Sequence, residues 1–138
     1  MKLSCFKFLL LTYLSISSVA KVTPNWWTKQ AGIEIANESL LNNLLIGEGK
    51  TKFIVIDFYW EKCPDCEHIL EEWNKIVNNG YSKFNGEVIF TQIEGKRNFD
   101  TIAVNYDINW YPTLIILAPH TYGTVYQRFP TSLGETQD

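Results

Sequence analysis

The sequence is short of the residues that several classes of protein need. Its 138 residues include only three cysteines and two histidines, so candidate metal ligands are few. It has no cluster of lysine or arginine and a formal net charge of −3, which argues against a nucleic-acid-binding protein. It also has no internal repeats and no low-complexity segments. The 46% of hydrophobic residues is typical of one globular domain with a core.

The first twenty residues have the pattern of a secretory signal peptide. Two lysines flank the start of an apolar run from Phe8 to about Ile16, and Ser18-Val19-Ala20 supplies the small residues that a signal peptidase needs. The run is shorter than the ~20 residues of a membrane-spanning helix. An uncleaved membrane anchor and a mitochondrial presequence are the alternatives. The absence of arginine from residues 1–20 argues against the presequence. We therefore predict a signal peptide over residues 1–20 and one domain over residues 21–138, in the endoplasmic reticulum lumen or secreted.

Removal of this peptide would leave two cysteines, Cys63 and Cys66. An even number of cysteines in a secretory compartment permits a disulfide. Asn37-Glu38-Ser39 is the only N-glycosylation sequon, which makes Asn37 a glycosylation candidate, although the same residue could instead cap a helix.

Hydrophobic periodicity predicts alternating helices and strands after an irregular segment over residues 21–32. We expect helices over residues 37–46, 63–77 and 98–105, and strands over residues 52–59, 87–93, 113–118 and 124–129. The strand over 52–59 is almost wholly apolar, as a central strand covered on both faces would be. The predicted buried side chains of the last two helices are Ile69, Trp73, Ile76, Val77, Ile102 and Val104. This order predicts an α/β or α+β domain with a mixed sheet.

Cys63 and Cys66 stand where the central strand passes into a helix, a position at which open α/β sheets place their sites. The start of a helix carries unpaired N–H groups and a partial positive charge, which favour the reactive thiolate of Cys63. Cys66, one turn on, can attack a mixed disulfide formed at Cys63. Pro64 suits the first turn because its missing N–H has no helical partner.

Two other interpretations of the cysteine pair stay open. A disulfide across so short a loop would stabilise the fold by only roughly 2 kcal/mol, so a purely structural staple gains little. A zinc site needs about four ligands, and besides the two cysteines only His68 and the distant His120 are obvious candidates. The spacing favours a redox dithiol, and no metal is predicted.

Two motifs resemble the thioredoxin superfamily, especially thioredoxins and protein disulfide isomerase domains. IVIDFYWEKCPDC is similar to the active-site segment of that family, and Trp110-Tyr111-Pro112-Thr113 followed by LIIL is similar to its cis-proline loop. The separation of the motifs also fits, and the resemblance runs from about Asn37 to Phe129. It implies a thioredoxin-like α/β fold.

The resemblance also implies roles for single residues. Cys63 would be the nucleophile and Cys66 the resolving thiol, with Asp57 a buried acid beneath them. A lone buried carboxylate has a raised pKa and could accept the proton of Cys66, whereas the alternative for Asp57 is a surface-facing residue at a strand end. Pro112 would be the cis-proline beside the dithiol, and its alternative is an ordinary trans proline that starts an edge strand.

Polypeptide substrates would bind near Trp60, Tyr111 and Pro112. The dithiol carries the electrons itself, so no further cofactor is expected.

Several positions depart from the family pattern. Lys62 stands before the first cysteine where the family usually has tryptophan, and Trp60 is the aromatic residue that could partly replace it. Asp65 lies between the cysteines and disfavours the Cys63 thiolate, so we expect a less oxidising pair than in a typical isomerase domain. The bulky Tyr111 before the proline is expected to narrow the choice of substrate.

The family closes with a helix over one face of the sheet, whereas residues 129–138 reach only a helix-start signal. We therefore expect a fold truncated after the last strand, and a protein partner for the apolar face left open. The predicted function is thiol–disulfide exchange on cysteine-containing polypeptides in the secretory pathway, as a reductase or isomerase. The alternative is a catalytically idle subunit or binding module with a structural Cys63–Cys66 disulfide.

Overall fold

The computed structural model describes residues 21–129, so the predicted signal peptide and residues 130–138 lie outside the described part of the chain. The elements are, in order, η1 (Trp26–Lys29), β1 (Ile33–Glu34), α2 (Glu38–Ile46), η2 (Glu48–Lys50), β2 (Phe53–Tyr59), α3 (Pro64–His68), α4 (Leu70–Lys83), β3 (Val88–Glu94), η3 (Ala103–Tyr106), β4 (Thr113–Leu117) and β5 (Tyr126–Arg128). Within residues 21–129, no helix is both long and apolar enough to span a membrane.

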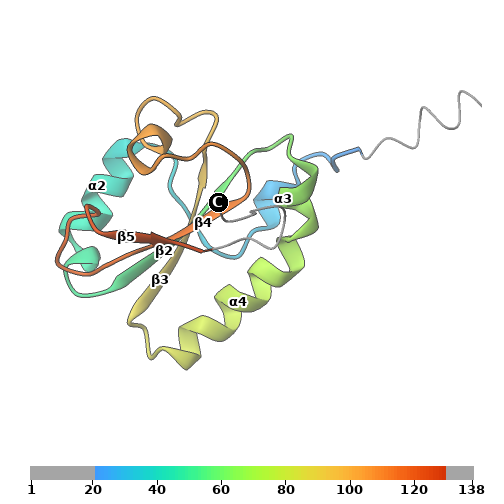
Figure 1. Ribbon diagram of the computed structural model, residues 1–138. Coiled ribbons are helices and arrows are strands. Elements are labelled where there is room, and N and C mark those ends of the chain that lie inside the picture. Colours follow the sequence, from blue (N-terminus) through green and yellow to red (C-terminus); the bar gives the residue numbers. More distant parts are fainter. Residues whose placement is uncertain (1–20, 130–138) are drawn as a thin grey trace, which may run out of the picture.

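A five-stranded mixed sheet with the strand order β1-β3-β2-β4-β5 forms the centre of the molecule (Figure 1). The first three strands of the chain run parallel, and β4 and β5 are antiparallel to their neighbours. β2 lies in the middle, hydrogen-bonded to β3 on one side and β4 on the other. This position agrees with its nearly continuous apolar sequence, and the α/β thioredoxin-like architecture predicted from the sequence is confirmed.

Helices cover both faces of the sheet (Figure 1). On one face, Leu41 and Leu45 of α2 pack in the largest core cluster with alternate β2 residues Ile54, Ile56 and Phe58. On the other face, side chains of α4 pack against the intervening β2 residue and against β3, as Trp73 and Val77 do with Val55 and Phe90. The side chains of β2 alternate between the two faces, so Val55, Asp57 and Tyr59 all point toward α3 and α4.

The helix ends follow local sequence signals. Asn37 lies before α2, where its Oδ1 accepts a hydrogen bond of 3.0 Å from the backbone N–H of Leu40, and Gly47 ends this helix. Asn37 is exposed, and its glycosylation stays a prediction.

The helix predicted over residues 63–77 differs from the structure in its middle and at its C-terminal end. It is divided at Ile69 into α3 and α4, and α4 continues to Lys83 through Asn78-Asn79-Gly80, a sequence that commonly ends a helix. Gly80 continues the helix because it packs against the ring of Phe90, so tertiary packing overrides the local signal. The prediction that Ile76 is buried is wrong, since its side chain is 50% exposed.

Two other predicted segments also need correction. Residues 98–105 form turns followed by the 3₁₀ helix η3, in which Ile102 is buried as predicted but Val104 is 48% exposed. The segment over 21–32 was expected to be irregular, yet it contains η1. β1 was missed because it is an edge strand of only two residues, too short to show periodicity.

An apolar groove of about 560 Å³ lies on the sheet face beside α4. It is lined almost entirely by apolar side chains, namely those of Phe53, Val55, Ile76, Phe84, Val88, Phe90, Leu114, Ile116 and Phe129, with Glu87 at its edge. Phe53, Phe84 and Phe129 are each more than two-fifths exposed, at 43%, 44% and 41%. The groove therefore leaves apolar side chains of this sheet face partly open to solvent.

We predict that Gly80→Ala destabilises the fold although alanine is the better helix former. A Cβ at this position would overlap the Phe90 ring, which is wedged between Trp73 and Tyr81 with ring centroids 6.3 and 5.6 Å away. The gain in helix propensity is about 1 kcal/mol, and overpacking costs roughly 1–3 kcal/mol. Urea unfolding should therefore show a net loss of stability. Asn79→Ala, on the exposed side of the same helix, is the control, and a stabilised Gly80→Ala would contradict the packing argument.

Candidate active site

A disulfide joins Cys63 and Cys66 at the point where β2 passes into α3. The Cα atoms of the two cysteines are 5.3 Å apart. Cys63 caps α3, and its Sγ accepts a hydrogen bond of 3.1 Å from the backbone N–H of Cys66, while Pro64 opens the helix. Both cysteines are buried, but Cys63 is the more exposed at 6% against 2% for Cys66. The same N–H can stabilise a Cys63 thiolate once the disulfide is reduced.

The loop before β4 meets the disulfide across 48 residues of sequence. The Tyr111–Pro112 peptide bond is cis, and Pro112 is buried. The Tyr111 carbonyl oxygen lies 3.5 Å from Cys63 Sγ. Thr113 holds the loop by donating a hydrogen bond of 2.8 Å from its hydroxyl to the Trp110 carbonyl.

Aromatic side chains border the same region. Trp60 and Tyr111 are half-buried and pack against the cluster that contains both cysteines. The ammonium group of Lys96 lies 5.4 Å from the Trp60 ring centroid and 5.7 Å from that of Tyr111. Tyr111 packs closely on Gly95, where a Cβ would overlap its ring. The three residues predicted from the sequence to bind substrate, Trp60, Tyr111 and Pro112, are therefore brought together around Cys63.

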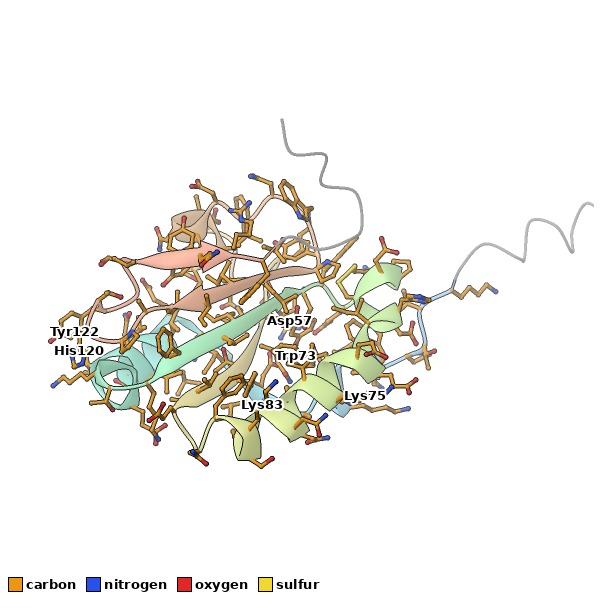
Figure 2. The ribbon with its side chains drawn as sticks, turned by 60° about the horizontal axis from the view of Figure 1, so that its bottom comes forward. Asp57, Trp73, Lys75, Lys83, His120 and Tyr122 are labelled. Atoms are coloured by element: carbon orange, nitrogen blue, oxygen red, sulfur yellow. A yellow bond between two sulfur atoms is a disulfide. The ribbon has the colours of Figure 1, made fainter. Side chains whose placement is uncertain are left out.

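Asp57 is buried on the face of β2 that carries α3 and α4. It is 2% exposed, and its Oδ1 has no hydrogen-bond partner among the described residues. Figure 2 shows Asp57 and Trp73 between β2 and α4. Burial raises the pKa of Asp57 to about 7, and the negative charge of Glu34 adds to the shift. The alternative of a surface-facing residue at a strand end is therefore wrong.

A row of polar residues crosses the sheet from Asp57 to the edge. Asp57 is paired in register with Gln92, and Gln92 with Glu34, so the three residues lie side by side on β2, β3 and β1. Residues paired in this way point to the same face of the sheet. The Glu34 carboxylate accepts a hydrogen bond of 2.9 Å from the Tyr59 hydroxyl, and burial raises the pKa of both groups. Glu34 thus places a second acidic group near Asp57.

Two residues near the dithiol, Glu94 and Trp26, were missed in the sequence analysis. Glu94, at the end of β3, is only 3% exposed, and its carboxylate accepts a hydrogen bond from the backbone of Glu61. Trp26 of η1 is 2% exposed and belongs to the same cluster as the two cysteines. The only sequence signals for these positions were the adjacent tryptophans Trp26-Trp27 and an acidic residue, Glu94, at the end of an apolar strand. Periodicity cannot show that such distant segments meet.

The histidines considered as metal ligands lie apart. His68 is exposed in α3, and His120 is exposed in the turn after β4, far from Asp57 (Figure 2). Over residues 21–129, no three Cys, His, Asp or Glu side chains are placed to share a metal ion.

Comparison with known proteins identifies the family. The thioredoxin family model matches residues 35–129, so the chain belongs to the thioredoxin family. No curated protein matches the sequence significantly.

Solved structures share the fold at low identity. Fasciola hepatica thioredoxin has a TM-score of 0.53 and 23% identity, over 70% of this chain and 84% of that one. The first thioredoxin domain of mouse protein disulfide-isomerase A4 has a TM-score of 0.61 and 18% identity, over 85% of this chain and 74% of that one. Human ERp44 has a TM-score of 0.62 and 16% identity, over 75% of this chain and 27% of its own.

We predict that Asp57→Asn changes how stability depends on pH. The folded pKa of about 7 lies above the unfolded value of about 3.9, so the folded state holds the Asp57 proton to higher pH. Its contribution to stability is therefore complete below about pH 4 and is lost as the pH rises to about 7, roughly 4 kcal/mol in total.

Urea unfolding of the oxidised protein between pH 4 and pH 8 tests this prediction. The free energy of unfolding of Asp57→Asn should vary less with pH than that of the wild type. The stability of the variant relative to the wild type should be greatest at pH 8. Parallel pH curves for the two proteins would show that Asp57 is ionised at neutral pH.

Proposed function

We propose that this protein is a thiol–disulfide oxidoreductase that acts on the cysteines of polypeptide substrates in the secretory pathway, as a reductase or isomerase. One observation carries the proposal: Cys63 Sγ lies at the start of α3, 3.1 Å from the Cys66 N–H and 3.5 Å from the Tyr111 carbonyl. A nucleophilic sulfur, a donor for its thiolate and a carbonyl acceptor beside it are thus gathered at one point.

The exchange proceeds in two displacement steps. The Cys63 thiolate attacks one sulfur of a substrate disulfide, that S–S bond breaks, and the other substrate sulfur leaves as a thiolate. Cys66 then loses its proton and attacks Cys63 Sγ, which releases the second substrate sulfur as a thiolate and closes the Cys63–Cys66 disulfide. The substrate gains the two electrons that the dithiol loses. Two equivalents of a small-molecule thiol can reduce the Cys63–Cys66 disulfide back to the dithiol, and their sulfurs leave joined as a small-molecule disulfide.

Asp57 is suited to accept the Cys66 proton. Because its pKa is raised to about 7 and its Oδ1 is unpartnered among the described residues, it is a base poised near neutral pH. Asp57 shares its sheet face with Tyr59, which packs in one cluster with both cysteines. Proton transfer here needs no cofactor beyond the dithiol itself.

The surface around Cys63 supports a polypeptide substrate. Trp60 and Tyr111 offer partly exposed aromatic area, and the exposed Trp110 extends it. Arg128 lies over the Trp110 ring, 5.5 Å from its centroid. Aromatic side chains that are partly exposed beside a reactive group are typical of surfaces that bind peptides.

The secretory location rests on the signal-peptide pattern of residues 1–20 and on the cysteine pair. Similarity in fold to a domain of protein disulfide-isomerase A4 supports the isomerase type.

A second candidate is a catalytically idle binding module whose cysteines stay in a structural disulfide. The apolar groove beside α4, with its exposed Phe53, Phe84 and Phe129, favours this candidate, because such a surface is typical of a site covered by a protein partner.

Trapping of mixed disulfides tests the proposed activity. Cys66→Ser removes the resolving sulfur, so substrate should remain attached to Cys63 and migrate as reducible adducts on non-reducing gels. Cys63→Ser should trap far less, because the buried Cys66 is the less accessible sulfur. Equal, minimal trapping by both variants under conditions that trap a known oxidoreductase would refute exchange at Cys63.

The reduction potential of the Cys63–Cys66 pair separates the two candidates. Equilibration in graded thiol/disulfide buffers, followed by alkylation and mass spectrometry, should give a reversible couple between about −270 and −180 mV for an exchange protein. A pair that stays oxidised below about −300 mV would behave as a structural disulfide and favour the binding module.

A further inference from the structure

The backbone of Glu61, two residues before Cys63, is hydrogen-bonded at both its N–H and its C=O. We infer that Trp26 and Glu94 clamp the Glu61 backbone and thereby keep Cys63 in its reactive geometry, so that both act as positioning residues for the dithiol. The inference rests on the proposed function, in which Cys63 is the attacking sulfur.

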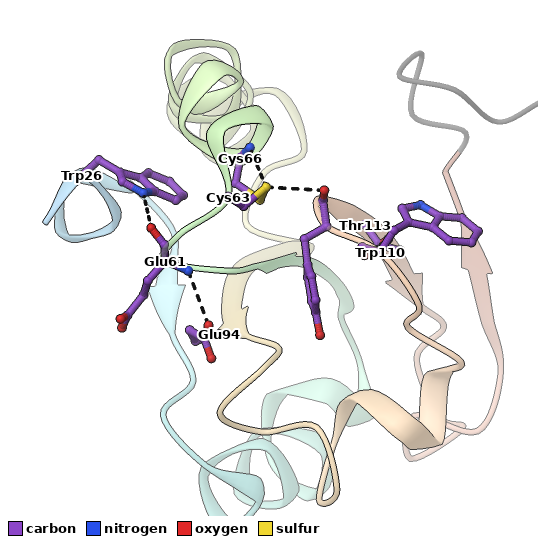
Figure 3. Close-up of a disulfide and its surroundings, with 8 residues drawn as sticks. Trp26, Glu61, Cys63, Cys66, Glu94, Trp110 and Thr113 are labelled. Carbon is purple, nitrogen blue, oxygen red and sulfur yellow. Dashed lines mark hydrogen bonds between the residues drawn. A yellow bond between two sulfur atoms is a disulfide. The ribbon is translucent and has the colours of Figure 1, made fainter. Parts of the chain in front are cut away.

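The two arms of the clamp come from distant parts of the chain (Figure 3). The indole N–H of Trp26 donates a hydrogen bond of 2.8 Å to the Glu61 carbonyl oxygen. The Glu61 backbone N–H donates to the Glu94 carboxylate at 3.4 Å. Trp26 is 2% and Glu94 3% exposed, so water competes little for either contact.

Each arm is itself fixed. The Trp26 ring packs edge-on against Tyr59, with centroids 5.8 Å apart, and lies in one cluster with both cysteines. The Glu94 carboxylate also accepts a hydrogen bond from the backbone N–H of Arg97, and the Arg97 side chain forms an ion pair with that of Glu61. The packed Trp26 ring and the Glu94 carboxylate, which accepts two hydrogen bonds, therefore meet at the backbone of one residue, Glu61.

The segment that carries Trp26, residues 21–32, also contacts α3, the helix that carries Cys66. The backbone N–H of Thr23 donates to the Glu67 carboxylate of α3, with N···O distances of 3.0 and 3.2 Å. Further along, Asn74 of α4 accepts a hydrogen bond of 2.7 Å from Ala31 N–H. The segment thus contacts the chain both before and after the cysteines, at Glu61 and at Glu67.

A loosened clamp would act on Cys63 through the short loop between them. Cys63 N–H donates a hydrogen bond of 3.0 Å to the Trp60 carbonyl, so Trp60 to Cys63 form one turn that includes Glu61. If that turn shifts, Cys63 Sγ moves away from the Cys66 N–H that would stabilise its thiolate. Neither Trp26 nor Glu94 is required by the exchange steps, so any effect on reactivity reports positioning.

The test compares Trp26→Phe with Trp27→Phe in the full domain. Phenylalanine keeps a buried ring but loses the N–H donor, whereas among the described residues the half-buried Trp27 makes no indole hydrogen bond. The readouts are the initial rate at which the reduced protein attacks a small aromatic disulfide reagent and the midpoint potential of the dithiol. We expect Trp26→Phe to react roughly fivefold more slowly, the factor that one lost neutral hydrogen bond represents, and Trp27→Phe to react at the wild-type rate.

Glu94 provides a second, independent test if Trp26→Phe folds poorly. Glu94→Leu should slow the same reaction, and Glu94→Gln, which keeps an acceptor oxygen, should restore most of the rate. Because both arms hold the backbone of the same residue, Trp26→Phe and Glu94→Leu combined should slow the reaction less than the product of their separate effects.

The inference would be overturned if the variants lowered thermal stability while rate and midpoint potential stayed at wild-type values, because the contacts would then be merely structural. Independent, multiplicative effects of the two arms would also contradict a shared clamp. The reaction with the small disulfide reagent does not depend on binding of a polypeptide substrate. A Trp26 effect together with failed mixed-disulfide trapping would therefore refute the proposed function and not the clamp.

Discussion

The burial of β2 on both faces is the constraint on which the rest of the structure depends. β2 is hydrogen-bonded on both edges, to β3 and β4, and α2 and α4 pack against its opposite faces. A strand so enclosed cannot shift its register without moving apolar side chains out of the core. Its last residue, Tyr59, therefore ends the strand at a defined place, and the turn that leads to Cys63 begins there.

That enclosure also explains why Asp57 is chemically unusual. A carboxylate in the middle of a covered strand loses its water, and its Oδ1 has no partner among the described residues. The ionised form is disfavoured for this reason, and the nearby Glu34 adds repulsion. A polar group of this kind lowers stability at neutral pH.

Sequence patterns predicted the structure best where the signal lies within one segment of the chain. The apolar run of β2, the paired leucines of α2 and the turn carrying Cys63 and Cys66 were all placed correctly because each signal is local. They failed where a neighbour decided the outcome. Gly80 continues α4 because the Phe90 ring fills the space beside it, and Val104 is exposed because residues 98–105 do not form a regular helix. β1 exists only because β3 offers it an edge to pair with.

By itself, the sequence determined the fold class, the position of the dithiol at a strand–helix junction and the two motifs that identify the family. These depend on residue spacing within one segment, which determines which side chains share a face or a turn. Only the tertiary structure brought Tyr111 to within 3.5 Å of Cys63 Sγ, buried Glu94 and set Trp26 against Glu61. These contacts join segments from 33 to 48 residues apart, and such distances in the chain leave no periodic trace.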